Sequence, residues 1–338
     1  MVDHRGERGA GLAWPDRGHG PRCGGRFGGS RIGKQAMSQS IDDTTPWADR
    51  LSLWAQVACQ WECVARKPGN VSRTHDFADT HLHDFLTSAA AIGPILGRAP
   101  CRPLGQTILE AVRATRTSVG SNTNLGLVLL LAPLAAVPRG EDTRTGVARL
   151  VAATTVEDAR LVYQAIRLAA PAGLGTVAGE DLASEPAISL VECMRLAAGR
   201  DQVAALWAGG FAELFDLHLP TLGGGLQHTG CLEGAIVLLH LYLMALAPDS
   251  LIARKRGEAE AVEASRLAGL AARSGWPHRQ AGWKALTDLD SFLRAQGHSR
   301  NPGTTADRVG ATLFAAFLTG QLELPCIFPW WIGEGIWP

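Results

Sequence analysis

The chain has 338 residues, of which 46% are hydrophobic and 19% are charged, and its formal net charge is zero. This composition is typical of a globular protein with a large core, built as one large or two ordinary domains. It argues against nucleic acid as a partner, because there is no excess of basic residues to neutralise phosphates along a duplex.

Residues 1–45 are rich in Gly, Arg and Ser and show no apolar period, so we predict a disordered N-terminal extension. Met37 is an alternative start of translation, in which case residues 1–36 are not made. The extension lacks the apolar stretch of a secretory signal. The odd number of scattered cysteines then indicates reduced thiols, and we expect a cytoplasmic protein. Cys59 and Cys63 share a helix face, but no second pair has metal-ligand spacing, which argues against a zinc site.

Helical patterns begin at Pro46 and continue to about residue 319. The first helix carries an apolar stripe in steps of three and four: Trp47, Leu51, Trp54, Ala58, Trp61 and Ala65. Further helices are expected at 80–97, 104–118, 123–137, 144–153, 156–169, 181–199, 201–217, 222–247, 250–274, 279–296 and 304–319. Alternating strand-like runs are few. We therefore predict an all-α fold, with residues 46–325 forming a single compact domain of about ten to twelve packed helices.

The two longest apolar runs, 125–137 and 232–247, are interrupted and fall short of the ~18 residues of a membrane span, so no membrane partner is expected. The C-terminal tail, residues 326–338, is too aromatic to be solvated. We expect it to dock on the body or on a partner subunit, which makes a homodimer one expectation.

Four polar segments interrupt the helices in the same way: 62–76, 116–126, 248–257 and 299–307. Each lies at a helix end and combines Gly or Pro with cations, carboxylates or amides. Cations and helix N-termini suit polyphosphate, and carboxylates suit Mg²⁺. In the second segment, Asn122 or Thr123 can N-cap the following apolar helix. No Walker, GxGxxG or GxSxG motif is present. If the four segments converge, they form a site.

Most of these residues also have a purely structural interpretation, which the sequence leaves open. Asp249 follows a proline and could simply N-cap the next helix. Lys67 could be an ordinary cation at a helix C-terminus. His81 and His83 form only a weak metal motif, and His240 is typical of a buried core histidine.

The four segments resemble, in order, the triphosphoribosyl-dephospho-CoA synthase family, and the similarity covers about residues 54–319. The matching positions are Glu62 with Lys67-Pro68-Gly69-Asn70-Val71; Gly120, Asn122, Thr123 and Gly126; Asp249-Ser250 with Arg254 or Lys255 and Gly257; and Pro302, Gly303, Ala306 and Asp307. The chain departs from the family in having Asn124-Leu125 where His-Lys is usual, and in lacking a His-Gly motif at 172–180. The family's His/Asp segment could correspond to His75, His81, His83 or Asp84.

The resemblance implies that ATP and 3′-dephospho-CoA react to give 2′-(5″-triphosphoribosyl)-3′-dephospho-CoA and adenine. It implies catalytic roles for Glu62, Asp249 and Asp307. Glu62 would act as base or oxocarbenium stabiliser, and the two aspartates would hold Mg²⁺. Lys67, Arg254 and Lys255 would hold the triphosphate. The remaining expected binding residues are Gly69, Asn70, Arg73, Gly120, Asn122, Thr123, Ser250 and Asn301.

Two other functions remain open at the sequence level. One is a related ribosyl-transfer or N-glycoside-cleaving enzyme that acts on another cofactor, which the Asn124-Leu125 departure favours. The other is a non-catalytic helical nucleotide-binding protein. Lys67, Asp249 and Asp307 argue against the second, because a scaffold has no need of buried charge at helix ends.

Overall fold

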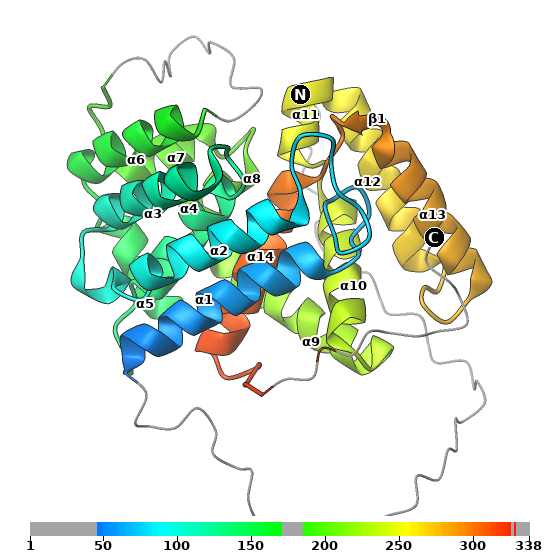
Figure 1. Ribbon diagram of the computed structural model, residues 1–338, viewed down its shortest axis with the longest axis horizontal. Helices are drawn as coiled ribbons and strands as arrows, with labels where there is room; N and C mark the ends of the chain where they lie inside the picture. Colours follow the sequence, from blue (N-terminus) through cyan, green and yellow to red (C-terminus); the bar gives the residue numbers. More distant parts are fainter. Residues whose placement is uncertain (1–45, 171–184, 326–327, 329–338) are drawn as a thin grey trace, which may run out of the picture. The chain divides into compact units, whose positions relative to one another are not determined.

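The computed structural model describes residues 46–170, 185–325 and Phe328, which belong to one unit of the chain, residues 40–338 (Figure 1). The predicted N-terminal extension and most of the aromatic tail therefore lie outside the described residues. Within these residues the fold is all-α, as predicted, with a 3₁₀ turn, η1 (Ala99–Cys101), a π-helix, η2 (Leu214–His218), and one short extended segment, β1 (Ala295–His298). The α-helices are α1 (Trp47–Val64), α2 (Leu82–Leu96), α3 (Leu104–Val119), α4 (Leu125–Ala135), α5 (Thr143–Ala152), α6 (Val156–Ala169), α7 (Leu190–Ala197), α8 (Gln202–Ala208), α9 (Leu219–Thr229), α10 (Leu232–Leu246), α11 (Ser250–Arg256), α12 (Glu258–Arg273), α13 (Gln280–Arg294) and α14 (Gly303–Leu318).

The described part of the chain has fourteen α-helices, more than the expected ten to twelve, because two predicted helices are each split by a glycine. Gly230, with φ +69°, separates α9 from α10, and Gly257, with φ +91°, separates α11 from α12. Glycine adopts positive φ at little cost, and that conformation ends a right-handed helix. A single glycine is also tolerated inside helices, so the apolar pattern alone did not reveal these breaks.

The centre of the fold is formed by α4 and α14, which pack against each other. Every residue of α4 except Gly126 is buried, in keeping with a helix that is apolar on all sides. α14 also contacts α1, α8, α9, α10 and α11, and in Figure 1 it runs behind α1 and α2. α14 thus connects α1, the first helix, with helices from the second half of the chain.

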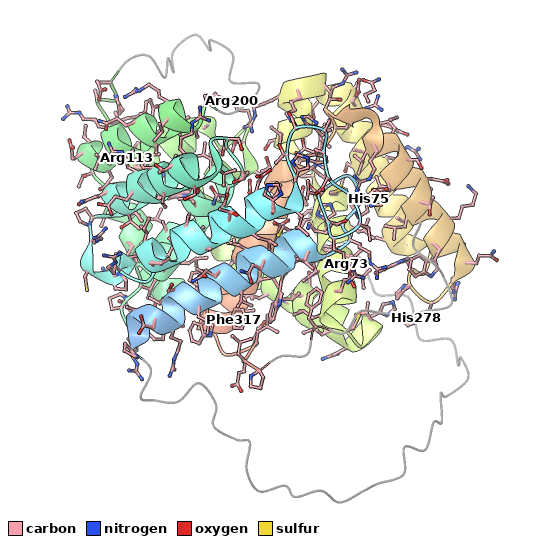
Figure 2. The ribbon with its side chains drawn as sticks, viewed as in Figure 1. Arg73, His75, Arg113, Arg200, His278 and Phe317 are labelled. Atoms are coloured by element: carbon pink, nitrogen blue, oxygen red, sulfur yellow. The ribbon has the colours of Figure 1, made fainter. Side chains whose placement is uncertain are left out.

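The apolar stripe predicted for α1 is confirmed and faces this core. Leu51, Ala58 and Ala65 are fully buried. The Trp54 ring stacks on Phe317 of α14 at 5.9 Å between ring centroids, and the Trp61 ring lies 5.4 Å from the same phenylalanine (Figure 2). Phe328, the one tail residue that the structure describes, stacks against Trp61 with 5.9 Å between ring centroids.

A second, smaller core lies between α10, α12 and α13. Small residues on α12, among them Ala264 and Ala268, are fully buried and allow close approach of α10. α10 serves both cores, since Leu239 packs in the first and Leu241 in the second.

Among the described residues no single helix is both long and apolar enough to cross a membrane. α10 and α11 reach the necessary length and composition only when taken together, and the two are bent by 59° relative to each other.

Candidate active site

A cavity of about 700 Å³ lies where the four polar segments meet. Its wall includes Asn70 from the first segment, Asn122 from the second, Arg254 from the third and Asp307 from the fourth. The four segments predicted from sequence therefore do converge. The volume is within the roughly 300–1,000 Å³ that is usual for sites that bind small molecules.

Glu62 and Lys67 form a buried ion pair at one wall of the cavity. Glu62 lies in the last turn of α1, is 7% exposed and faces the cavity. The chain turns back after Ala65, so that the Lys67 Nζ lies 2.9 Å from Glu62 Oε1 and also donates to the Glu62 carbonyl oxygen. Lys67 is 1% exposed and does not line the cavity. This position differs from the expectation that Lys67 holds a triphosphate. Its ammonium compensates the negative charge of Glu62 from a position outside the cavity wall.

Asp307 faces the cavity from α14 and lies against the N-terminus of α4. The two helices approach so closely that a Cβ at position 126 would collide with the Asp307 carboxyl group, which explains the glycine there. Asp307 keeps some exposure to the cavity but is otherwise enclosed by protein. This burial raises the pKa of the Asp307 carboxyl well above its ordinary value, and the negative charge of Glu62 raises it further. The surroundings of Asp307 therefore favour its protonated form more than water does.

Asp249 does not line the cavity. Its Oδ1 accepts hydrogen bonds from the backbone N–H groups of Leu251 (2.9 Å) and Ile252 (3.1 Å), so it N-caps α11. Its Oδ2 accepts from the N–H and the hydroxyl of Thr305, both at 2.7 Å. Ser250 is likewise buried and donates to the Thr304 hydroxyl, 3.1 Å away. Both residues join α11 to α14, in place of the ligand contacts expected from sequence.

The expected Mg²⁺ site of Asp249 and Asp307 does not fit this geometry. A magnesium ion binds ionised carboxylates with free lone pairs. The oxygens of Asp249 are occupied by four hydrogen bonds, and Asp249 does not line the cavity. Burial and the charge of Glu62 raise the pKa of Asp307, which disfavours the ionised carboxylate that Mg²⁺ needs. We therefore assign no metal ion to this pair.

The loop between α3 and α4 supplies amide groups to the cavity. Asn122 Oδ1 accepts from the N–H of Leu125 at 3.1 Å, so Asn122 does cap α4, although the N-cap position itself is Asn124. Thr123 hydrogen-bonds Ser88 at 2.5 Å. The Oδ1 of Asn124 accepts from the Thr115 hydroxyl, which leaves its Nδ2 as a donor.

Two buried amide groups in the cavity wall have no partner among the described residues. They are the Nδ2 atoms of Asn70 and Asn124, whose side chains are 7% and 6% exposed. Unpaired buried donors are costly, so two of them in the wall of one cavity indicate that a ligand or water supplies the acceptors. Gly120, with φ +79°, ends α3 beside this loop but is not part of the wall.

Cations line the side of the cavity next to α11. Arg254 forms an ion pair with Asp201, and Lys255 donates to the Asn301 Oδ1 at 2.9 Å. All four residues line the cavity. Arg254 and Lys255, predicted to hold the triphosphate, and Asn301, predicted as a binding residue, thus all line the cavity.

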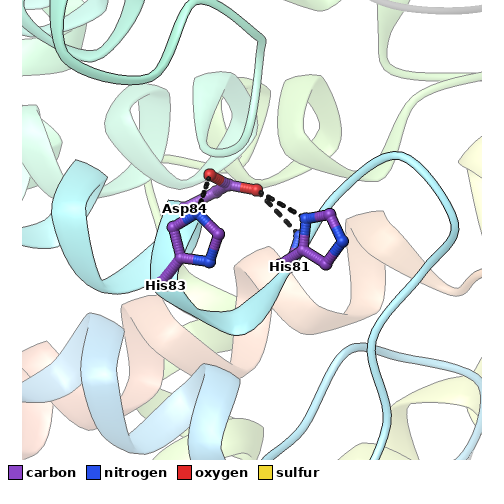
Figure 3. Close-up of side chains that lie close together, drawn as sticks. All are labelled: His81, His83 and Asp84. Carbon is purple, nitrogen blue, oxygen red and sulfur yellow. Dashed lines mark hydrogen bonds and ion pairs between the residues drawn. The ribbon is translucent and has the colours of Figure 1, made fainter.

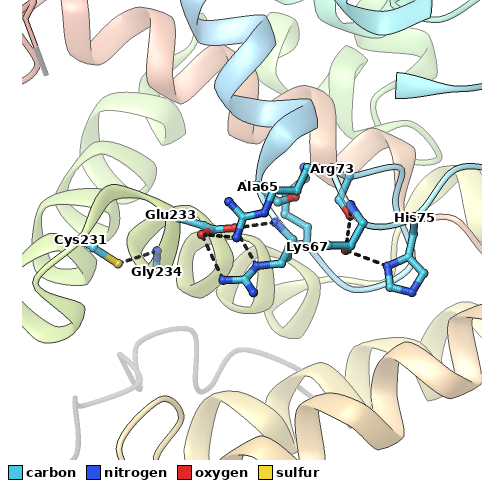
Figure 4. A network of polar contacts seen from close by, with 10 residues as sticks. Ala65, Lys67, Arg73, His75, Cys231, Glu233 and Gly234 are labelled. Atoms are coloured by element: carbon cyan, nitrogen blue, oxygen red, sulfur yellow. Dashed lines mark hydrogen bonds and ion pairs between the residues drawn. The ribbon is translucent and has the colours of Figure 1, made fainter. Parts of the chain in front are cut away.

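Gly69 and Arg73 of the first polar segment also lie outside the cavity. Arg73 pairs with the buried Glu233, 3.4 Å away, beside Arg66 (Figure 4). Gly69, with φ +73°, donates its N–H to Asp290 at 2.7 Å. These contacts fasten the segment to α10 and α13, which is a structural role in place of the expected ligand contacts.

His81, His83 and Asp84 form a cluster (Figure 3). None of the three lines the cavity, although Thr80 and Phe85 on either side of them do. Their potential ligand atoms lie within 4.8 Å of one another. However, Asp84 accepts the N–H of His81 at 2.8 Å as the cap of α2, and the positive end of that helix disfavours a further cation. His75 does not line the cavity either.

Sequence reasoning did not single out Asp79, Tyr163, Arg200 and Asp201, which all line the cavity. Asp201 resembles a simple N-cap, and its Oδ1 does accept from Val203 and Ala204. Its second oxygen reaches Arg254, which no local pattern reveals.

Comparisons with known proteins identify the family of the chain. A family model described as ATP:dephospho-CoA triphosphoribosyl transferase matches residues 48–325, which include all four polar segments. Among solved structures, the chain is similar to a protein from Archaeoglobus fulgidus named as a candidate triphosphoribosyl-dephospho-CoA synthase. The identity is 24%, the TM-score is 0.53, and the match covers 70% of this chain and 99% of that chain. This likeness shows a shared fold. No curated protein matches the sequence.

Proposed function

Because the chain belongs to the family of ATP:dephospho-CoA triphosphoribosyl transferases, we propose that its cavity carries out that family's reaction. The protein is a pentosyltransferase that moves a 5-triphosphoribosyl group from ATP to 3′-dephospho-CoA. The acceptor's ribose 2′-hydroxyl forms a bond to C1′ of ATP, and the bond between C1′ and adenine breaks. One proton leaves the hydroxyl and one proton reaches adenine, so the reaction needs a base and an acid.

The observation that best supports this proposal is the contrast between Glu62 and Asp307. Both carboxyl groups line one cavity, and their surroundings differ. Lys67 compensates the charge of Glu62, whereas Asp307 has no ion-pair partner among the described residues and its pKa is raised. Two carboxyl groups in such different environments are suited to separate acid and base roles.

In this mechanism Asp307 donates its proton to adenine as the bond to C1′ breaks. Glu62 accepts the proton of the attacking hydroxyl, and its negative charge stabilises the oxocarbenium-like centre at C1′. The buried ammonium of Lys67 positions Glu62 and does not itself touch the substrate.

The triphosphate is placed against Arg254 and Lys255, beside the N-terminus of α14. Gly303 and Thr304 at this helix end line the cavity next to Asn301. The positive end of a sixteen-residue helix adds to the two cations in favouring an anion. The donor amides of Asn70 and Asn124 would bind oxygen atoms of a ribose.

We also propose a cytoplasmic location. Both substrates are intracellular nucleotides, and the five cysteines among the described residues are all free thiols. Fractionation of cells that express the tagged chain would test this location.

The test of the proposed function is adenine release from ATP by the full chain in the presence of Mg²⁺, with and without dephospho-CoA. We expect adenine only when both substrates are present, and a product with the mass of triphosphoribosyl-dephospho-CoA. Asp307→Asn should lower the rate by roughly 10²–10⁴-fold, the usual contribution of an acid or base. Asp288→Asn, at an exposed position on α13, is the matched control.

Two outcomes would contradict the proposal. Equal adenine release without dephospho-CoA would indicate an N-glycoside-cleaving enzyme. Binding of ATP without any adenine release would indicate a nucleotide-binding protein that does not catalyse this transfer.

A further inference from the structure

One part of the cavity wall is mainly apolar, and we call it the apolar chamber. It is lined from α6 and α7 by Val162, Tyr163, Ile166, Leu190, Cys193 and Met194. Val162 and Leu190 are fully buried, and Met194 is 8% exposed. A cavity surrounded by such side chains offers water few hydrogen-bond partners, so it is suited to an apolar group of a ligand.

These six side chains contribute two polar groups, of which the Cys193 thiol also donates to the Ile188 carbonyl oxygen at 4.0 Å. The Tyr163 hydroxyl and the Cys193 thiol are hydrogen-bonded, and burial raises the pKa of Tyr163 to about 12. Both groups therefore remain neutral. The positive charge of Arg200 acts in the opposite direction and lowers the pKa of Tyr163. Arg200 also lines the cavity, so a cation lies near the chamber.

The chemistry of the two substrates decides which of their parts suits the chamber. Adenine has several hydrogen-bonding nitrogens on its edge, and it must receive a proton as it leaves. The six chamber side chains include no acid, and their two polar groups are already bonded to each other, so adenine would lose hydrogen bonds there. The acid that we propose, Asp307, lies in the polar part of the cavity. The acceptor differs from ATP in carrying a long arm that ends in methylene groups and a thiol.

We propose that the apolar chamber binds the distal end of the acceptor's pantetheine arm, and so selects dephospho-CoA over nucleotides that lack the arm. This inference rests on the proposed function. The arm would leave the nucleotide at the polar part of the cavity, and its diphosphate would pass near Arg200. Its thiol end would lie among Ile166, Cys193 and Met194.

Ala197 offers a variant that blocks the chamber. It is the last residue of α7, is half-buried and lines the cavity, whereas the neighbouring Ala198 is half-buried but does not. Ala197→Phe should raise the KM for dephospho-CoA by roughly tenfold to 200-fold, the range for steric changes in an apolar pocket, and leave the KM for ATP unchanged. Ala198→Phe should change neither value. Thermal melts of both variants show whether each is folded.

A second measurement uses the unmodified protein. Under this proposal 4′-phosphopantetheine competes with dephospho-CoA, and ADP-ribose, which carries a polar group in place of the arm, is a much poorer acceptor. If Ala197→Phe raises the KM for ATP, the chamber belongs to the purine and the inference is wrong. Equal use of ADP-ribose and dephospho-CoA would also overturn it. Absence of transfer to dephospho-CoA by the unmodified protein would instead contradict the proposed function.

Discussion

At the scale of single residues, Lys67 shows how a motif cation can act without touching a ligand. Its side chain is fully enclosed, and its Nζ is bonded to the Glu62 carboxylate and to backbone carbonyl oxygens. A lysine sequestered in this way cannot reach a triphosphate. It fixes the position and compensates the charge of the one carboxylate that must remain negative in the proposed mechanism.

We predict that Lys67→Met lowers the free energy of unfolding by about 3–5 kcal/mol, because it leaves Glu62 buried without its partner. Urea denaturation measures the change. The double variant Lys67→Met/Glu62→Gln should recover part of the loss, since it removes both charges. If Lys67→Met unfolds like the unmodified protein and only the KM for ATP increases, the ammonium contacts phosphate after all.

Asp307 gives a prediction about pH with a definite sign. Its raised pKa means that the folded chain holds the proton at pH values where the unfolded chain has lost it. The stability associated with Asp307 is therefore fully present below the ordinary Asp pKa of about 3.9, and is lost as pH rises through the raised value. Asp307→Asn should thus raise the melting temperature near neutral pH.

The same residue should control the alkaline side of the rate profile. An acid must be protonated to act, so kcat should fall as pH rises through the pKa of Asp307. Asp307→Asn should remove most activity while increasing stability, a trade-off that is common where function requires a buried titratable group. If this variant is less stable than the unmodified protein, Asp307 is ionised and its acid role is excluded.

At the scale of elements, the contact between the N-terminus of α4 and α14 sets the position of Asp307. Gly126→Ala would place a methyl group against the Asp307 carboxyl group, although the backbone of Gly126 is helical. We predict a fall in kcat of tenfold or more, because a displacement of about 1 Å at the reacting groups is costly. Steady-state kinetics of adenine release measure the change.

Gly120→Ala is the matched control for this prediction. Gly120 has φ +79° and open space around its Cα, so an added methyl group strains only the backbone. That strain costs about 1–2 kcal/mol of stability and should leave kcat unchanged. If the two variants lower kcat equally, the close approach of α4 and α14 has no special importance for catalysis.

The sequence predicted where the site would form better than it predicted which side chains would face it. Gly, Pro and polar residues at helix ends are local signals, and they located all four segments. Asp249 and Asp307 look alike in sequence, each close to the start of a helix. What separates them is Thr305, which donates two hydrogen bonds to Asp249 from 56 residues away. Such long-range contacts leave no local pattern, and the same holds for the pairing of Asp201 with Arg254.

At the scale of the whole molecule, the cavity is built from segments distributed over most of the described chain. Its wall contains residues from α1, the α3–α4 loop, α6, α7, α11 and α14. α11 follows α10, which contributes to both hydrophobic cores, and α14 packs against both α10 and α11. The cavity therefore depends on the relative position of helices that belong to different parts of the core.

This architecture predicts that binding of substrates and global unfolding are coupled. A ligand that binds only the folded chain stabilises it by about 2.7 kcal/mol when its concentration is 100 times its Kd. Because α10 and α14 connect both cores to the cavity wall, we expect all helices from α1 to α14 to unfold in one transition. ATP should shift that whole transition to higher temperature. Calorimetry with increasing ATP measures the shift. Two separate transitions, with the α12–α13 part unaffected by ATP, would show that the second core folds independently and that the site does not require it.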